Sequence, residues 1–409
     1  MSSSSPAPPT APGASLSWLP GLMLAVFVIG TDDFIIAGVL PEIAADLRVS
    51  EAAAGQLVTV FSLVYAVAAP VMAVLTARLP RRAIVVGGLA VFALVNATTV
   101  AATSYPALLA LRVLAALVAA SVSPAVFAVA GTLAPSHRTG RAIGAVAAGL
   151  TVSLVVGVPL GSWLGAEFGW RATFVLVAGL TVVAVAVTAG TLPRLPDQPA
   201  TGVRERLSLL RRPAVLTCVA GTVVGACAGL LPYVFIAPVI VDLTGAERSW
   251  VPVVIGVYGL AGAIGTVLGG RLNDQWGTDR SVLALLTLVC GATVAMAVTG
   301  LLGGGDVPLP LLVALIVVWG LAGWAYNPPM NARALRLAGA AGTEAIALNT
   351  SGLYVGIAAA GVVGGGALSV GGGVGVLLAA GLVGFGNLAF MIRAVRRYPA
   401  APAASAGAS

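Results

Sequence analysis

Two adjacent carboxylates, Asp32 and Asp33, lie inside the first long apolar stretch of the chain, and residues 18–40 carry no other charge. An ionised carboxylate at the centre of a membrane helix costs roughly 2.5–3.5 kcal/mol, so such a residue normally faces a wet cavity or binds a proton. Burial and the repulsion between neighbouring carboxylates both favour a protonated form. The pair is therefore the first candidate for proton chemistry.

The two aspartates cannot have equal surroundings, because consecutive helix residues point about 100° apart. From the residues alone, Asp32 could instead cap or hydrogen-bond an irregular turn, and Asp33 could contact substrate or form a structural pair. Arg112 is the one basic residue that we expect inside a span. An unpaired guanidinium there is costly, so it should bind a carboxylate or backbone carbonyls. Arg112 either tunes the proton affinity of the aspartates or forms a fixed structural pair.

The composition identifies the class of protein. The chain is 59% hydrophobic and 9% charged, with a mean hydropathy of +1.04, whereas soluble domains are roughly 45–50% apolar and about 25% charged. A polytopic membrane protein is indicated. The pI of about 9.9 does not indicate nucleic-acid binding, because the arginines fall at the ends of apolar stretches. The sequence has no P-loop, zinc-ligand spacing or nucleophile elbow, so we expect no enzyme, cofactor or metal site.

Apolar runs of about 20 residues, the length that crosses a bilayer, predict an all-helical protein with twelve spans. They cover residues 18–40, 55–77, 83–102, 106–131, 141–165, 171–192, 214–238, 251–270, 281–302, 309–331, 346–368 and 373–393. We expect two six-helix bundles, 18–192 and 214–395, joined by a cytoplasmic linker, 193–213. The tails 1–17 and 396–409 should lie in the cytoplasm, the first of them disordered.

The arginines predict the orientation. If the N-terminus is cytoplasmic, 17 of the 21 basic residues fall in inner loops or the C-terminal tail, and the outer loops hold only Arg48, Arg171 and Arg248. This distribution follows the positive-inside rule. We expect a bacterial inner-membrane protein with both termini in the cytoplasm, and a monomer.

The two halves are similar to each other. Pro41 at the end of the first span and Pro238 at the end of the seventh lie 197 positions apart, as do Ala73 and Gly270 after the second and eighth spans. One shared offset at two places indicates a duplicated six-span unit. Parallel repeats of this kind place a binding site at mid-bilayer, between the halves.

Two motifs carry a family resemblance. The first span reads Thr31-Asp32-Asp33-Phe34, and the fifth carries Gly149, Gly157, Pro159, Gly161 and Gly165. With these motifs, residues 18 to about 395 resemble the major facilitator superfamily, and within it the twelve-span drug:proton antiporters that export chloramphenicol and purines. The resemblance implies that Asp33 occupies the acidic position of those exporters and that Arg112 matches an arginine of their fourth span. The glycines resemble the motif that marks exporters, although generic small-residue packing is the alternative.

The loop after the second span departs from the superfamily pattern. That loop usually contains glycines and an aspartate, which are absent here, while the copy in the second half keeps Gly270, Asp274 and Gly277. The resemblance implies that these loops close a cytoplasmic gate. The candidate gate residues are Arg78, Arg81, Arg82, Gly270, Asp274 and Gly277.

Aromatic and amide side chains within the spans are candidates for a substrate cavity, because together they suit a neutral, amphipathic ligand. A lipid-facing place is the alternative for each aromatic, whereas an amide facing lipid is costly. The candidates are Phe34, Phe61, Tyr65, Tyr233, Asn327, Asn349 and Tyr354.

The leading hypothesis is proton-driven export of a small, mostly uncharged compound, such as a phenicol antibiotic. Export of purines, nucleosides or sugars is the alternative within transport. A membrane sensor without transport is a different class of function, and it would show no efflux of any compound. Substrate identity, proton stoichiometry and the proton-carrying aspartate stay open at this point.

Overall fold

The computed structural model describes residues 16–76, 79–134, 139–193, 212–339 and 342–400. Every regular element within these ranges is a helix. The predicted linker and tails lie largely outside them, as does Arg78. The first half comprises α1 (Leu19–Phe34), α2 (Ile36–Asp46), α3 (Glu51–Leu75), α4 (Arg81–Val100), α5 (Tyr105–Leu133), α6 (Thr139–Val152), a π-helical turn (Ser153–Gly157), α7 (Val158–Phe168) and α8 (Trp170–Thr191).

The second half repeats this order. It comprises α10 (Pro213–Val234), α11 (Ile236–Thr244), α12 (Val251–Trp276), α13 (Thr278–Gly303), α14 (Leu309–Ala325), α15 (Asn327–Ala338) and α16 (Gly342–Arg397). In both halves the first span is broken nearer its C-terminal end, at Ile35 between α1 and α2 and at Phe235 between α10 and α11. The helices α1 and α2 meet at an angle of 45°.

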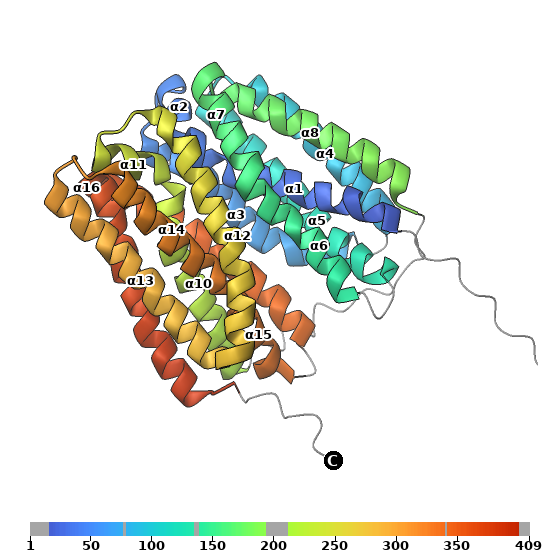
Figure 1. Ribbon diagram of the computed structural model, residues 1–409. Coiled ribbons are helices and arrows are strands. Elements are labelled where there is room, and N and C mark those ends of the chain that lie inside the picture. The colour runs from blue at the N-terminus through green and yellow to red at the C-terminus, as the bar shows by residue number, and fades with distance from the viewer. Residues whose placement is uncertain (1–15, 77–78, 135–138, 194–211, 340–341, 401–409) are drawn as a thin grey trace, which may run out of the picture.

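The helix α16 contains two spans. Its apolar part, Ala345–Arg397, has 53 residues and would be about 80 Å long if straight, against roughly 30 Å for the bilayer core. The helical geometry fails at Gly371 and Gly372, where Gly372 has a φ of +57°, and Figure 1 shows the orange and red limbs of α16 folding back on each other. With the bent pair α1–α2 taken as one span, the described residues contain a helix at each of the twelve predicted spans.

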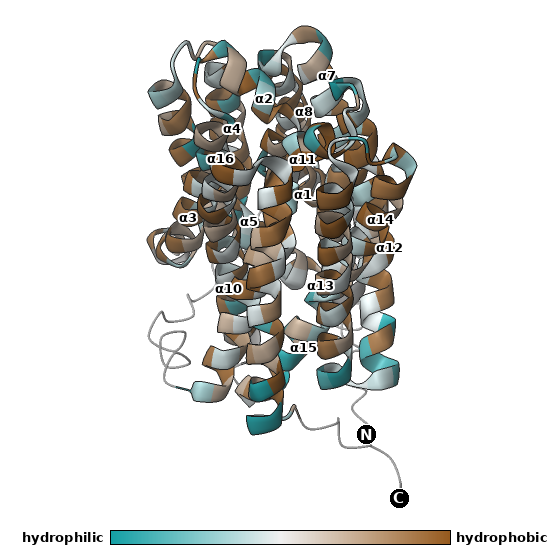
Figure 2. Cartoon of the chain, turned by 90° about the vertical axis from the view of Figure 1, so that its left-hand side faces the viewer, coloured by the Kyte–Doolittle hydropathy of each residue, from teal (hydrophilic) through white to brown (hydrophobic). Residues whose placement is uncertain are grey.

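The outer surface of the bundle is apolar. Large side chains on it include Val67, Leu94 and Leu382, which are 62%, 66% and 77% exposed. Figure 2 shows hydrophobic residues along the helix middles and hydrophilic residues gathered toward the ends. Such a band fits a lipid environment, where apolar side chains need no further cover.

The glycines of the fifth span pack directly against the first span. A methyl group added at Gly149, Gly157, Gly161 or Gly165 would overlap Met23, Thr31, Ile35 or Val39, respectively. Both sets of residues recur mostly at four-residue intervals, so one stripe of the fifth span faces one stripe of α1–α2. The absence of side chains lets the two backbones approach closely.

The opposite side of the fifth span contacts the second half of the molecule. Pro159 lies beside Gly256 of α12, and the backbone of Leu154 lies against Gly259 of the same helix. The fifth span is therefore placed between the first span and the other bundle. Its π-helical turn, Ser153–Gly157, lies within this contact region.

The two halves meet most closely at one end of the molecule. Figure 1 shows them converging at α2, α7 and α11 and separating toward α6 and α15. At the closed end Gln56 donates a hydrogen bond to the Gly361 carbonyl at 3.1 Å, Phe235 packs on Gly55, and Arg248 pairs with Glu51 at 3.8 Å. The helices of the two halves are therefore spaced more widely at the end that carries α6 and α15.

We predict that Gly161→Leu destabilises the protein because the new side chain must displace Ile35 of the first span. Overpacking of this kind lowers the free energy of unfolding by roughly 1–3 kcal/mol. Gly179→Leu is the matched control, since Gly179 is exposed on α8 with open space around it. Unfolding of the purified variants in a denaturing detergent measures both. Equal stability of the two variants would contradict the close packing of the first and fifth spans.

Candidate functional site

Asp32 forms a buried ion pair with Arg112. Asp32 lies in the last turn of α1 and Arg112 in the N-terminal third of α5, and the two residues are 0% and 1% exposed. The Arg112 Nη1 donates to Asp32 Oδ2 at 2.8 Å, and Nη2 donates to the Asp32 carbonyl at 3.2 Å. The guanidinium also lies 4.4 Å from the ring centroid of Phe61, a cation–π contact. The charge on Asp32 is thus balanced inside the first half.

Asp33 has different surroundings from Asp32. Its Oδ2 accepts a hydrogen bond at 3.2 Å from the hydroxyl of Tyr354, a residue of α16 in the second half. Asp33 also lines a small cavity of about 270 Å³ between the halves, together with Phe34, Tyr233 and aliphatic residues. Of the two aspartates, Asp33 is therefore the one that lines a cavity.

A larger cavity adjoins this one and shares Phe34, Leu230 and Ile357 with it. It holds about 900 Å³ of empty space, its mouth included. All of its lining residues except Phe34 and Leu150 come from the second half, and none of them carries a formal charge. The lining of this cavity, apolar with a few polar groups, suits a small organic molecule.

Polar side chains form a row along one side of the larger cavity. Thr222 donates to Asn349 at 2.6 Å, Asn349 donates to Asn331 at 2.9 Å, and Asn331 donates to Asn327 at 2.6 Å. All four residues line the cavity. The sequence predicted Asn327 and Asn349 as cavity residues, but not Asn331 or Thr222. The position of Asn331, four residues after Asn327 on one helix face, was the available signal.

Aromatic rings form the other part of the wall. Phe34 lies 5.7 Å from Tyr233 and 6.1 Å from Trp324, measured between ring centroids. The Trp324 indole donates to the Tyr258 hydroxyl at 3.0 Å. Tyr258 and Trp324 line the larger cavity, although neither was among the predicted cavity residues.

Two predicted cavity residues lie behind the wall. Phe61 is fully buried beneath Arg112. Tyr65 stacks on the ring of Tyr354, with 3.9 Å between centroids. Tyr65 therefore supports a cavity-lining side chain, and neither residue is in the lining of either cavity.

Comparison with known proteins identifies the family. Residues 22–344 match the Major Facilitator Superfamily. The chain belongs to this superfamily. It is 35% identical to a chloramphenicol resistance protein of Streptomyces lividans over 349 residues, which are 83% of this chain and 86% of that protein. It is also 32% identical to the inner membrane transport protein YdhP of Escherichia coli K12, over 86% of this chain and 88% of the relative.

A solved structure supports the same fold. A bacterial homologue of the human lysosomal transporter Spinster superimposes with a TM-score of 0.74, covering 94% of this chain and 97% of the other, at 18% sequence identity. The predicted all-helical superfamily fold is confirmed, and the chain is a multi-pass membrane protein of a transporter family. Among the described residues no group of three His, Cys, Asp or Glu side chains could hold a metal ion.

The candidate gate residues of this superfamily member make local contacts. Arg82 donates to the carbonyl of Ala189 at 2.6 Å, which joins α4 to α8 within the first half. Asp274 is exposed and accepts a hydrogen bond from its neighbour Asn273 at 3.3 Å. Gly277 ends α12 with a φ of +81°, and Arg81 begins α4. Gly270 lies within α12 and faces open space.

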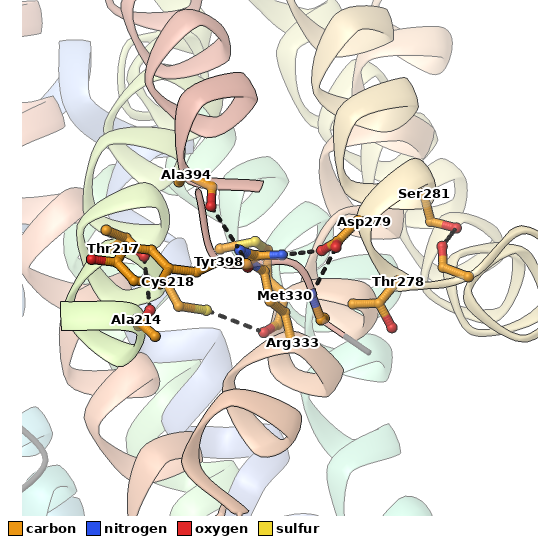
Figure 3. Close-up of polar contacts among 12 residues, drawn as sticks. Ala214, Thr217, Cys218, Thr278, Asp279, Ser281, Met330, Arg333, Ala394 and Tyr398 are labelled. Carbon is orange, nitrogen blue, oxygen red and sulfur yellow. Dashed lines mark hydrogen bonds and ion pairs between the residues drawn. The ribbon is translucent and has the colours of Figure 1, made fainter. Parts of the chain in front are cut away.

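A second buried arginine corrects one sequence-based placement. Arg333 was assigned to an inner loop, yet it is fully buried on α15, within the span Leu309–Ala338. It pairs with Asp279 and donates to the Tyr398 carbonyl at 2.6 Å. Asp279 also accepts from the backbone amide of Ala400 at 2.8 Å. Figure 3 shows this cluster, which joins α13, α15 and the end of α16.

We predict that Arg112→Gln is strongly destabilising, because it leaves the Asp32 carboxylate buried without its partner. Removing one member of a buried pair costs roughly 3–5 kcal/mol. The double variant Asp32→Asn with Arg112→Gln should recover much of this loss. As a comparison, Asp46→Asn breaks the exposed pair with Arg171 and should cost about 1 kcal/mol or less. A double variant no more stable than Arg112→Gln would contradict this interpretation of the pair.

Proposed function

We propose that this chain exports a small, mostly uncharged compound across the bacterial inner membrane in exchange for protons. The observation that carries the proposal is a surplus acidic residue, Asp33, in the lining of a small cavity that adjoins a larger, uncharged one. Two buried acids, Asp32 and Asp33, share one buried base, Arg112. Asp33 is the acid left without a charged partner, and a carboxyl in that position can bind and release a proton.

The lining of the larger cavity supports a neutral, amphipathic substrate. Aromatic rings supply apolar contact, and the row from Thr222 to Asn327 supplies hydrogen-bond donors and acceptors. A charged substrate would find no compensating charge among the lining residues. Phenicol antibiotics have this chemistry, and the name of the Streptomyces lividans relative points the same way.

Purines, nucleosides or sugars form the second candidate substrate class. The observation that favours them is the polar row itself, since three neighbouring amides can bind a ligand rich in hydroxyl or ring-nitrogen groups. Phenicols have more apolar surface to bury than purines, nucleosides or sugars do. The aromatic part of the cavity lining therefore favours phenicols.

Transport would proceed by rocking the 1–192 half against the 213–395 half. The cavity between them would open to each side in turn. The glycine face of the fifth span supports this motion, because it allows close packing against α1 while Pro159 and Leu154 contact α12. The arginine distribution supports a cytoplasmic location for both termini and for the end of the molecule at which the halves separate. The gate loops would close that end in the opposite state.

We predict that expression in a drug-sensitive host without its own pumps raises resistance to chloramphenicol, and that an uncoupler abolishes the effect. Asp33→Asn should remove resistance and proton-driven efflux, since the amide cannot carry a proton. The same variant should still exchange labelled for unlabelled substrate across vesicle membranes, because exchange needs no net proton movement. Inverted vesicles containing a pH-sensitive dye measure both activities.

Asp306→Asn is the matched control, because Asp306 is an exposed carboxylate in the loop before α14. It should retain wild-type efflux. Normal proton-driven efflux by Asp33→Asn would remove Asp33 as the carrier. Resistance that survives collapse of the proton gradient would contradict antiport, and purine or sugar efflux without drug efflux would favour the second substrate class. No efflux of any compound would favour a membrane sensor.

A further inference from the structure

Tyr354 connects the two halves at the acidic site. Its hydroxyl lies 3.2 Å from Asp33 Oδ2, and the bond joins α16 of the second half to α1 of the first. The residue lies in the interior of the molecule. The position of this tyrosine therefore depends on what Asp33 offers as a hydrogen-bond partner.

The ring of Tyr354 is also held by the first half. It stacks on Tyr65 at 3.9 Å between centroids, with 28° between the ring planes. Tyr65 in turn stacks on Phe61 at 6.4 Å, and Phe61 lies under the Arg112 guanidinium. One continuous set of contacts thus leads from the ion pair through two rings to Tyr354, and from Tyr354 back to Asp33.

The same side chain forms part of the larger cavity. Tyr354 lines that cavity together with Asn349, Leu353 and Ile357 of its own helix. Phe34 is the other cavity residue next to Asp33, but its side chain has no hydrogen-bonding group. Tyr354 is consequently the cavity side chain that also hydrogen-bonds the surplus carboxyl.

We propose that Tyr354 is the positioning residue that couples ligand binding in the larger cavity to proton binding at Asp33. This inference rests on the proposed function. When Asp33 is ionised, its carboxylate accepts a hydrogen bond from the Tyr354 hydroxyl, and this bond fixes the position of the ring in the cavity lining. When a proton binds to the carboxylate oxygen, the tyrosine loses its charged acceptor and keeps its own proton. The Tyr354 ring is then free to move, and the ligand binds less tightly.

The coupling has the sign that antiport requires. A ligand that needs the fixed ring favours the ionised form of Asp33 and so expels its proton, and by reciprocity a bound proton weakens the ligand by the same factor. Loading on the less acidic side and release on the more acidic side follow from one hydrogen bond.

Other titratable groups face Asp33 and must be considered. They are Asp32 on the same helix, Arg112 on α5, Tyr65 on α3 and Tyr233 on α10, whose hydroxyl lies 3.4 Å from the Phe34 carbonyl. Tyrosine and arginine keep their protons between about pH 6 and pH 8, and Asp32 is paired with Arg112. A pH effect on ligand binding in this range is therefore assigned to Asp33.

The test measures equilibrium binding of chloramphenicol to the full-length protein in lipid nanodiscs at about pH 6 and about pH 8. Wild type should bind at least about fivefold more weakly at the lower pH, the lower range of typical coupling factors. Tyr354→Phe keeps the stacked ring and removes the hydroxyl, so its affinity should be the same at both pH values. Asp33→Asn should lose the pH effect too. Addition of ligand should release protons from wild type and not from Tyr354→Phe.

Tyr326→Phe is the control, because it removes a hydroxyl from another tyrosine of the same cavity that has no contact with Asp33 in the structure. Whatever the affinity of Tyr326→Phe for chloramphenicol, the change in its affinity between the two pH values should match that of wild type. A wild-type pH effect that survives in Tyr354→Phe overturns the role of Tyr354 and leaves the proposed function standing. If wild type binds neither chloramphenicol nor any other candidate substrate, such as a purine, nucleoside or sugar, the proposed function fails, and this inference fails with it.

Discussion

The structure depends on how three charged side chains are held inside an apolar bundle. Asp32, Asp33 and Arg112 are all at most 5% exposed, in a molecule whose outer surface faces lipid. Burying a charge is tolerable only when a partner or a set of donors compensates it. Arg112 compensates Asp32 through two hydrogen bonds. The remaining carboxyl, Asp33, must bind a proton or find neutral donors, and the structure gives it the hydroxyl of Tyr354. The difference between the two aspartates is thus a matter of charge balance.

The backbone around the site is arranged for this balance. The first span is interrupted at Ile35, directly after the aspartates and Phe34, so the acidic residues lie at a bend and not within a straight helix. Glycines of the fifth span allow its backbone to lie against the same stretch of α1. Close packing on that side leaves the other sides of α1 for α5, which supplies Arg112, and for the second half, which supplies Tyr354. A larger residue at Gly157 or Gly161 would push α1 toward both of these partners.

The sequence predicted the helices better than the contacts between them. Apolar runs of bilayer length located all twelve spans, because lipid requires such runs wherever a helix crosses. Asp32, Asp33 and Arg112 were identifiable for the same reason, since charge inside a span is expensive. The pairing of Arg112 with Asp32 and not Asp33 depends on helix rotation, which composition does not record. Tyr65 and Phe61 were placed in the cavity because an aromatic residue has similar neighbours in sequence whether it lines a cavity or supports its wall. The sequence predicts Arg333 in a loop because this residue follows the tenth predicted span, 309–331, and only the continuation of α15 to Ala338 buries it.

The second half contains its own buried base, and the comparison explains why the two halves differ in chemistry. Arg333 is paired with Asp279, one base with one acid, and its Nη2 donates to the backbone carbonyls of Ala394 and Tyr398 near the end of α16. Among the described residues, this cluster leaves no surplus carboxyl facing the larger cavity, whose second-half lining is neutral. A neutral wall can bind an uncharged ligand without disturbing any proton equilibrium of its own. Under the proposed function, proton binding at Asp33 in the first half and ligand contact in the second half would take place in different parts of the molecule. Tyr354 contacts Asp33 and lines the larger cavity, so it is the side chain through which one event would influence the other.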